Sequence, residues 1–203
     1  PNASTITPTT PNGLSLILEG TNTNQEAANV LKASVIENNF IGITRPTVAI
    51  PNGIAGPNAA NGIFVNSQEA SEIQDLQILN NTLRNNNSAD TQAGLLFLRE
   101  DKSVLRSSNP ADRAITIAGN TIGGNRNGIL LDARNGSIDM LDFELRNNFI
   151  GTDSTGADLG NANDGISLIT QADARLLVDM DNNQIRFNNL NGIHSSDVVG
   201  NFA

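Results

Sequence analysis

Short runs of alternating apolar and polar residues recur along the chain, and each of them starts at a glycine. The glycine is followed by an aliphatic residue, then any residue, then in most cases a second aliphatic residue. Residues two apart on an extended strand point to the same side, so this alternation predicts a short strand with one buried face. These segments begin at Gly13, Gly62, Gly94, Gly128, Gly165 and Gly192.

A second kind of segment lies between successive glycine segments and ends in two adjacent asparagines, or once in Gly–Asn. Asparagine at a repeated bend can adopt the left-handed conformation, and its amide can bond to the same residue of a stacked neighbour. The pattern therefore predicts an asparagine ladder, which accounts for part of a content of 31 asparagines, well above average usage. The expected members are Asn39, Asn81, Asn120, Asn148 and Asn183.

The strict alternation of the two segments predicts the fold. Successive glycine segments begin between 27 residues (Gly165 to Gly192) and 49 residues (Gly13 to Gly62) apart, so each unit has room for two or three short strands, as in a parallel β-solenoid. Asn–Gly is also the strongest short hairpin signal, but the residues before Asn61 and Asn191 do not read as strands long enough to pair across a tight turn. One helical turn is expected at 25–31, where apolar residues have helical spacing.

One stretch carries a resemblance to a known family. Residues 147–156, followed by Gly160–Asn161 and by 163–166, resemble the right-handed parallel β-helix repeat of large secreted and surface-anchored bacterial proteins. The resemblance covers residues 34–195, and pectate lyases and polygalacturonases share this architecture. It implies an extracellular or cell-surface location and an all-β, right-handed parallel β-helix of about five to six rungs, and it implies the chemistry less strongly.

The expected division of the chain is simple. Residues 12–203 are expected to form a single parallel β-helix domain with irregular loops at 42–60, 84–93 and 151–164. Residues 1–11 are rich in threonine and proline and are expected to form an extended arm or linker.

Composition excludes several classes of function. The net charge is −9, and the 12 lysines and arginines are scattered singly, so the chain lacks the basic footprint that nucleic-acid binding requires. No apolar run approaches the roughly 18 residues of a membrane span. The absence of cysteine excludes a thiolate metal site.

Two acidic groups are candidates for chemistry. The repeat register predicts that Glu144, Asp179 and Asp181 gather on one outward face beside Arg146, with an Arg146–Asp181 ion pair and a merely solvated face as the alternative. The loop at 153–164 alternates oxygen-bearing residues with glycines, a composition that calcium accepts. Its candidate ligands are Asp153, Asp158 and Asp164, although Asx turns explain the same residues. No cofactor is expected, and calcium is the one candidate.

The outward position of the glycine segments gives two further expectations. Phe64, Leu96 and Leu130 occupy it in three consecutive units and predict an exposed apolar stripe, unless a loop such as 42–60 covers them. His194, the only histidine, occupies the same position and is expected to face solvent rather than to belong to a catalytic triad.

These features favour a non-enzymatic structural protein, a subunit of a cell-surface filament or fibre. The chain has no tryptophan or tyrosine and only two lysines, whereas sugar-active grooves commonly present aromatic and charged groups. The alternatives are a polysaccharide-active β-helix lyase or hydrolase and an adhesin passenger fragment of a larger protein, with surface carbohydrate as a candidate partner. Self-association is expected end to end through uncapped strands, at Leu14, Leu16 and Leu18 and at Val198 and Val199.

Overall fold

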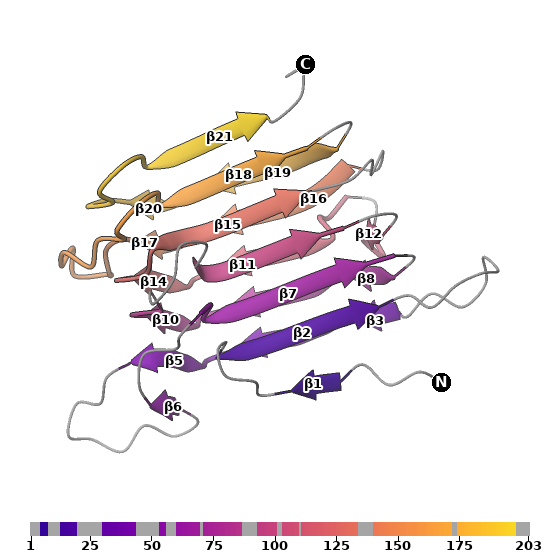
Figure 1. Ribbon diagram of the computed structural model, residues 1–203, viewed down its shortest axis with the longest axis horizontal. Coiled ribbons are helices and arrows are strands. Elements are labelled where there is room, and N and C mark those ends of the chain that lie inside the picture. Colours follow the sequence, from indigo (N-terminus) through magenta and orange to yellow (C-terminus); the bar gives the residue numbers. More distant parts are fainter. Residues whose placement is uncertain are drawn as a thin grey trace.

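The computed structural model describes residues 5–7, 13–19, 30–43, 53–55, 60–69, 71–86, 93–100, 103–109, 111–133, 140–171 and 174–197. Every regular element in these ranges is a β-strand, and the strands form four sheets. Apart from β1, which pairs antiparallel with β2, all paired strands run parallel. The chain passes through the sheets in the same order again and again, so that each winding lies on the previous one (Figure 1).

The two sheets with the most strands follow each other along the chain, since each strand of the six-stranded sheet from β10 to β20 precedes a strand of the seven-stranded sheet. The seven-stranded sheet, in spatial order, contains β1 (Thr5–Thr7), β2 (Leu14–Glu19), β7 (Ile63–Gln68), β11 (Ala93–Arg99), β15 (Asn127–Ala133), β18 (Ile166–Thr170) and β21 (Ile193–Asp197). The six-stranded sheet contains β20 (Gln184–Ile185), β17 (Phe149–Ile150), β14 (Thr121–Gly123), β10 (Thr82–Arg84), β5 (Phe40–Ile43) and β6 (Gly53–Ala55).

The other two sheets complete the windings. The five-stranded sheet contains β19 (Arg175–Asp181), β16 (Met140–Arg146), β13 (Ile115–Ala118), β9 (Leu76–Leu79) and β4 (Val35–Glu37). The three-stranded sheet contains β12 (Val104–Arg106), β8 (Glu72–Gln74) and β3 (Val30–Lys32). In the later windings β16 and β19 are seven residues long.

The core consists of columns of aliphatic side chains. Ile63, Leu95, Ile129 and Ile166 are in-register partners in the seven-stranded sheet, and all four are fully buried. The expected period-2 alternation is therefore confirmed: the apolar residue after each glycine points inward and packs on its counterpart one strand spacing away. Phe97 and Phe143 meet edge to face inside the stack, with ring centroids 5.0 Å apart, and so join two sheets across the core.

Part of the N-terminal segment pairs with the first strand of the seven-stranded stack. Thr5–Thr7 form β1, which pairs antiparallel with β2 and occupies its edge. Leu16 and Leu18 point into the core and are almost fully buried. The expectation of an open edge at Leu14–Leu18 is therefore wrong, because the chain folds back to satisfy that edge itself.

Two other expectations fall partly or wholly on residues outside the described ranges. The predicted helical turn is not formed at Val30 and Leu31, which lie in β3, and residues 25–29 lie outside the described residues. Val198 and Val199 also lie outside them.

The predicted apolar stripe is a real column but not an exposed one. Phe64, Leu96 and Leu130 are in-register partners, yet Leu130 is only 7% exposed, and Phe64 and Leu96 are half-buried. In-register side chains about 4.8 Å apart cover one another's flanks. The expectation of an exposed stripe is wrong because it considered each residue without its neighbours in the stack.

The columns give a test of the register. Ile129→Asp places a carboxylate in the middle of the aliphatic column and is expected to lower the free energy of unfolding by more than about 4 kcal/mol. Ile193→Asp is the matched control, because Ile193 is the register partner of Ile166 in the last described winding and is 50% exposed. It should cost only about 1 kcal/mol. Urea unfolding followed by circular dichroism measures both, and equal losses would contradict the assigned register.

Candidate functional site

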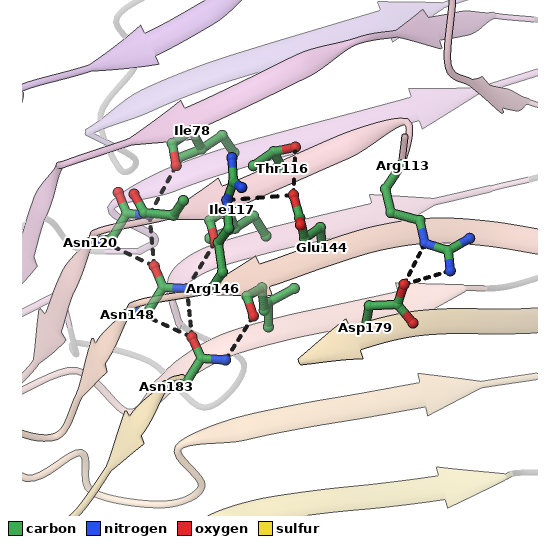
Figure 2. A network of polar contacts seen from close by, with 12 residues as sticks. Ile78, Arg113, Thr116, Ile117, Asn120, Glu144, Arg146, Asn148, Asp179 and Asn183 are labelled. Atoms are coloured by element: carbon green, nitrogen blue, oxygen red, sulfur yellow. Dashed lines mark hydrogen bonds and ion pairs between the residues drawn. The ribbon is translucent and has the colours of Figure 1, made fainter. Parts of the chain in front are cut away.

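The five predicted asparagines form a continuous column at the bend between the five-stranded and six-stranded sheets. The Nδ2 atom of each donates to the Oδ1 atom of the next, over 2.9 Å from Asn39 to Asn81, 3.1 Å to Asn120, 3.0 Å to Asn148 and 2.9 Å to Asn183. Each of these Oδ1 atoms also accepts the backbone N–H of the asparagine before it. Figure 2 shows Asn120, Asn148 and Asn183 aligned in this way.

The second N–H of each inner amide binds a backbone carbonyl of a neighbouring winding. Asn120 donates to Ile78 and Asn148 donates to Ile117, over 2.9 and 2.8 Å. Amides that are buried and fully hydrogen-bonded stabilise, whereas unpaired ones cost free energy. The residue before each ladder member has positive φ, as the bend requires: Asn38, Asn80, Gly119, Asn147 and Asn182.

A second asparagine column, which the sequence analysis missed, follows the strands of the six-stranded sheet. Asn86 donates from Nδ2 to Asn125 over 2.9 Å, the backbone N–H of Asn125 donates to Asn161 Oδ1 over 3.1 Å, and Asn161 donates from Nδ2 to Asn188 over 2.8 Å. A signal existed, since Asn86, Asn125 and Asn188 each lie three residues after a buried or half-buried aliphatic residue. The fourth member, Asn161, does not follow this spacing because the loop after Gly151 is inserted before it.

The loop leaves the stack at Gly151, which needs to be glycine. Its φ is +76°, and a Cβ atom there would run into the carbonyl oxygen of Arg186 in the next winding. Only glycine combines this conformation with so close a backbone approach.

A third polar column is formed by residues just before the strands of the seven-stranded sheet, and one of its members is a carboxylate. Asp164 is 6% exposed, and its backbone N–H donates to Asn127 Oδ1 over 3.4 Å. Its Oδ1 accepts both Nδ2 and the backbone N–H of Asn191, over 2.8 and 3.1 Å. Its Oδ2 lies 3.2 Å from Nδ1 of His194, whose side chain is 48% exposed as expected. Asp164 therefore serves as a structural acceptor between two windings.

The predicted calcium site is not assembled. Asp153 Oδ1 accepts Thr155 Oγ1 over 2.6 Å and two backbone N–H groups of its own loop, and Asp158 caps the N–H of Gly160. The hydroxyl of Thr155, and then the N–H of Ala157, lower the pKa of the Asp153 carboxyl because they bind its charged form. The described residues contain no group of three or more His, Cys, Asp or Glu side chains that could hold a metal ion. The loop is built from Asx turns.

The candidate site is a polar groove on the outer face of the five-stranded sheet, with a volume of about 430 Å³. Strands β9, β13, β16 and β19 form its floor, and the loop before β13 forms one wall. Gln77, Thr116, Glu144 and Asp179 are in-register partners, one from each strand, and the shared face of Glu144 and Asp179 is the predicted one. The groove is lined by Asp75, Leu76, Gln77, Ser108, Ala111, Asp112, Arg113, Thr116, Glu144, Arg146 and Asp179.

The ion pairs in the groove differ from the expected one. Arg113 Nε donates to Asp179 Oδ2 over 2.7 Å, and Arg146 Nε lies 3.5 Å from Glu144 Oε2 (Figure 2). The predicted Arg146–Asp181 pair is not formed: Asp181 is the register partner of Arg146, but the guanidinium lies beside Glu144, two residues away on the same face of β16. Ion pairs between side chains this exposed contribute about 0–1 kcal/mol each to the free energy of unfolding. The pairs therefore fix the orientation of side chains in the groove and add little to the stability of the fold.

Asp75 holds the loop against the groove. Its Oδ1 accepts the backbone N–H of Ser108 over 2.8 Å and the hydroxyl of Ser107 over 3.2 Å. Hydrogen bonds, led by the side chain of Ser108, hold the pKa of Asp75 below its ordinary value of 3.8. The groove thus offers oriented carboxylates, guanidinium groups and hydroxyls, which suit a polar, hydroxyl-rich ligand.

Comparison of the chain with protein-family models, with curated proteins and with solved structures finds no match. No helix within the described ranges is long and apolar enough to cross a membrane.

The asparagine ladder gives the second test. Asn148→Leu keeps the approximate volume but leaves the N–H groups of Asn120 and the carbonyl of Ile117 without partners, and Asn148 is fully buried. The free energy of unfolding should fall by about 3 kcal/mol or more. Asn39→Leu, at the half-buried end of the same ladder, should cost about 1 kcal/mol. Thermal and urea unfolding measure both, and an unchanged stability of the Asn148 variant would show that the ladder does not stabilise the fold.

Proposed function

We propose that the chain is a non-enzymatic structural module of an extracellular or cell-surface protein, built as a right-handed parallel β-helix. The observation that carries the proposal is the continuity of its interior. Aliphatic columns and polar columns run from winding to winding, and their hydrogen bonds join different windings. Such a stack is a stiff, repetitive rod, which suits a stalk or fibre. The right hand follows from the strong preference of parallel crossover connections.

The proposal includes self-association through the last described winding. Ile193 is 50% exposed, whereas its register partner Ile166 is fully buried. Leu190 and Phe187, in the same winding, are 63% and 50% exposed. Because β1 already occupies the edge of β2, the partner we propose for the face around β21 is the same face of a second copy. The contact would then be isologous and give a closed dimer.

The dimer is tested by sedimentation over a range of protein concentrations. The double variant Leu190→Lys, Ile193→Lys should abolish association, because it places two cations on an apolar contact. Val35→Lys is the matched control, since Val35 is 50% exposed at the other end of the stack, and it should leave association intact. A wild-type chain that is monomeric at high concentration, or a control as defective as the double variant, would refute the proposed contact.

A second candidate function, carbohydrate binding or cleavage, is favoured by the polar groove. The in-register residues Gln77, Thr116, Glu144 and Asp179 repeat at a strand spacing of about 4.8 Å, which is close to the length of one sugar unit in an extended chain. The groove has more carboxylates than guanidinium groups, so it should bind neutral glycans in preference to acidic ones.

The enzymatic alternative is tested by incubating the purified chain with pectin, alginate and neutral polysaccharides in the presence of calcium. We expect no release of reducing or unsaturated ends. Turnover that disappears in Glu144→Gln or Asp179→Asn, with Asp181→Asn as an active control, would show instead that the groove is catalytic.

A further inference from the structure

The dipeptide Asn–Gly occurs in the third polar column in three windings, at 61–62, 127–128 and 191–192. Asn–Gly is chemically special because the glycine nitrogen can attack the asparagine Cγ atom, and no side chain on the glycine hinders the approach. Three identical dipeptides at equivalent positions allow their environments to be compared directly.

In the inner windings the attacking nitrogen is held by the next winding. The N–H of Gly62 donates to the carbonyl of Ala93 over 3.1 Å, and that of Gly128 donates to the carbonyl of Asp164 over 3.0 Å. A Cβ atom on either glycine would collide with the carbonyl oxygen of the glycine in the next winding. The backbone at these sites therefore cannot move toward the asparagine side chain without opening the stack.

The last dipeptide lacks this restraint. Within the described part of the chain the N–H of Gly192 has no acceptor, and a Cβ atom there would meet only Ile185 Cγ2, at 3.6 Å. Asn191 is exposed, whereas Asn61 and Asn127 are buried. The nitrogen of Gly192 is therefore less restrained than those of Gly62 and Gly128, while Asn191 itself is held from the preceding winding by Asp164 Oδ1 and by the N–H of Gly165.

We propose that Asn191–Gly192 is a site of spontaneous covalent modification by deamidation. The nitrogen of Gly192 forms a bond to Cγ of Asn191, and the bond from Cγ to Nδ2 breaks. Nδ2 leaves as ammonia, taking the proton released by the Gly192 nitrogen. Water then opens the five-membered imide at either carbonyl and leaves aspartate or isoaspartate at 191, with no change of oxidation state.

The modification acts on the last winding through Asp164. The Nδ2 atom of Asn191 is a donor to Asp164 Oδ1, and the product replaces it with a carboxylate. Two carboxylates then face each other beside a buried position, which disfavours the contact. His194, at 3.2 Å from Oδ2 of Asp164, offers a cation there when it is protonated. Deamidation therefore loosens β21 and leaves the inner windings intact.

The test is peptide mapping by mass spectrometry after incubation at mildly alkaline pH, at a dilution where sedimentation shows single chains. Under this condition the result does not depend on the proposed dimer. Conversion at Asn191 should be at least about tenfold faster than at Asn61 or Asn127, because those sites must first open. Equal rates at the three sites, or conversion at Asn191 only after unfolding, would overturn the proposal. The pairs at 12–13, 52–53 and 135–136 include residues outside the described ranges and do not enter the comparison.

Two variants separate the chemistry from its consequence. Gly192→Ala should abolish conversion while the melting temperature stays the same, since the space above Gly192 accepts a methyl group. Asn191→Asp reproduces one product and should increase amide hydrogen exchange in β21 but not in β15. Unchanged exchange in β21 would refute the loosening of the last winding.

Discussion

The register between windings is the constraint on which the structure depends, and side-chain amides impose it. A buried amide must satisfy a donor pair and an acceptor, and in the column from Asn39 to Asn183 the partners are the same residue one winding away and a backbone carbonyl of a neighbouring winding. A shift by one residue along a strand would leave these groups unpaired in the core and would also turn every aliphatic side chain outward. The aliphatic columns supply most of the burial, and the amides select one register among several apolar alternatives.

The same constraint explains why the windings tolerate long insertions. A long loop can be inserted between two strands provided that the chain re-enters the stack in register with the neighbouring winding. The free-energy cost of closing such a loop grows only slowly with its length. The segment from Gly151 to Asn161 departs at a glycine in the left-handed conformation and comes back at an asparagine that pairs with Asn188. Its aspartates serve this return by capping N–H groups of the loop. These bonds are the Asx turns that the sequence offered as the structural interpretation of the loop.

The inward half of the fold could be predicted from the sequence, whereas the outward half could be predicted only in part, as for Glu144, Asp179 and His194. Inward positions follow from the neighbours along the chain, because period-2 alternation marks Ile129 and Ile166 as buried. Outward positions depend on neighbours in other windings. Leu130 was expected to be exposed and is buried. Arg146 was expected to pair with Asp181 and instead lies beside Glu144. The second asparagine column was missed because one insertion disrupted its spacing, and β1 was missed because no periodicity marks a three-residue strand.

Asp164 shows how an end of the stack differs from its middle. In the third column the carboxylate of Asp164 accepts hydrogen bonds from two N–H groups of Asn191 in the next winding. A carboxylate is tolerated at this buried position because these donors satisfy it. That winding has no such successor among the described residues, and its own amides and glycine nitrogen are correspondingly less restrained. Stability in a stacked fold therefore falls toward a terminal winding even when every winding has the same composition. Chemistry, exchange and association should all be sought first at that end, because there the groups that hold the interior together face outward.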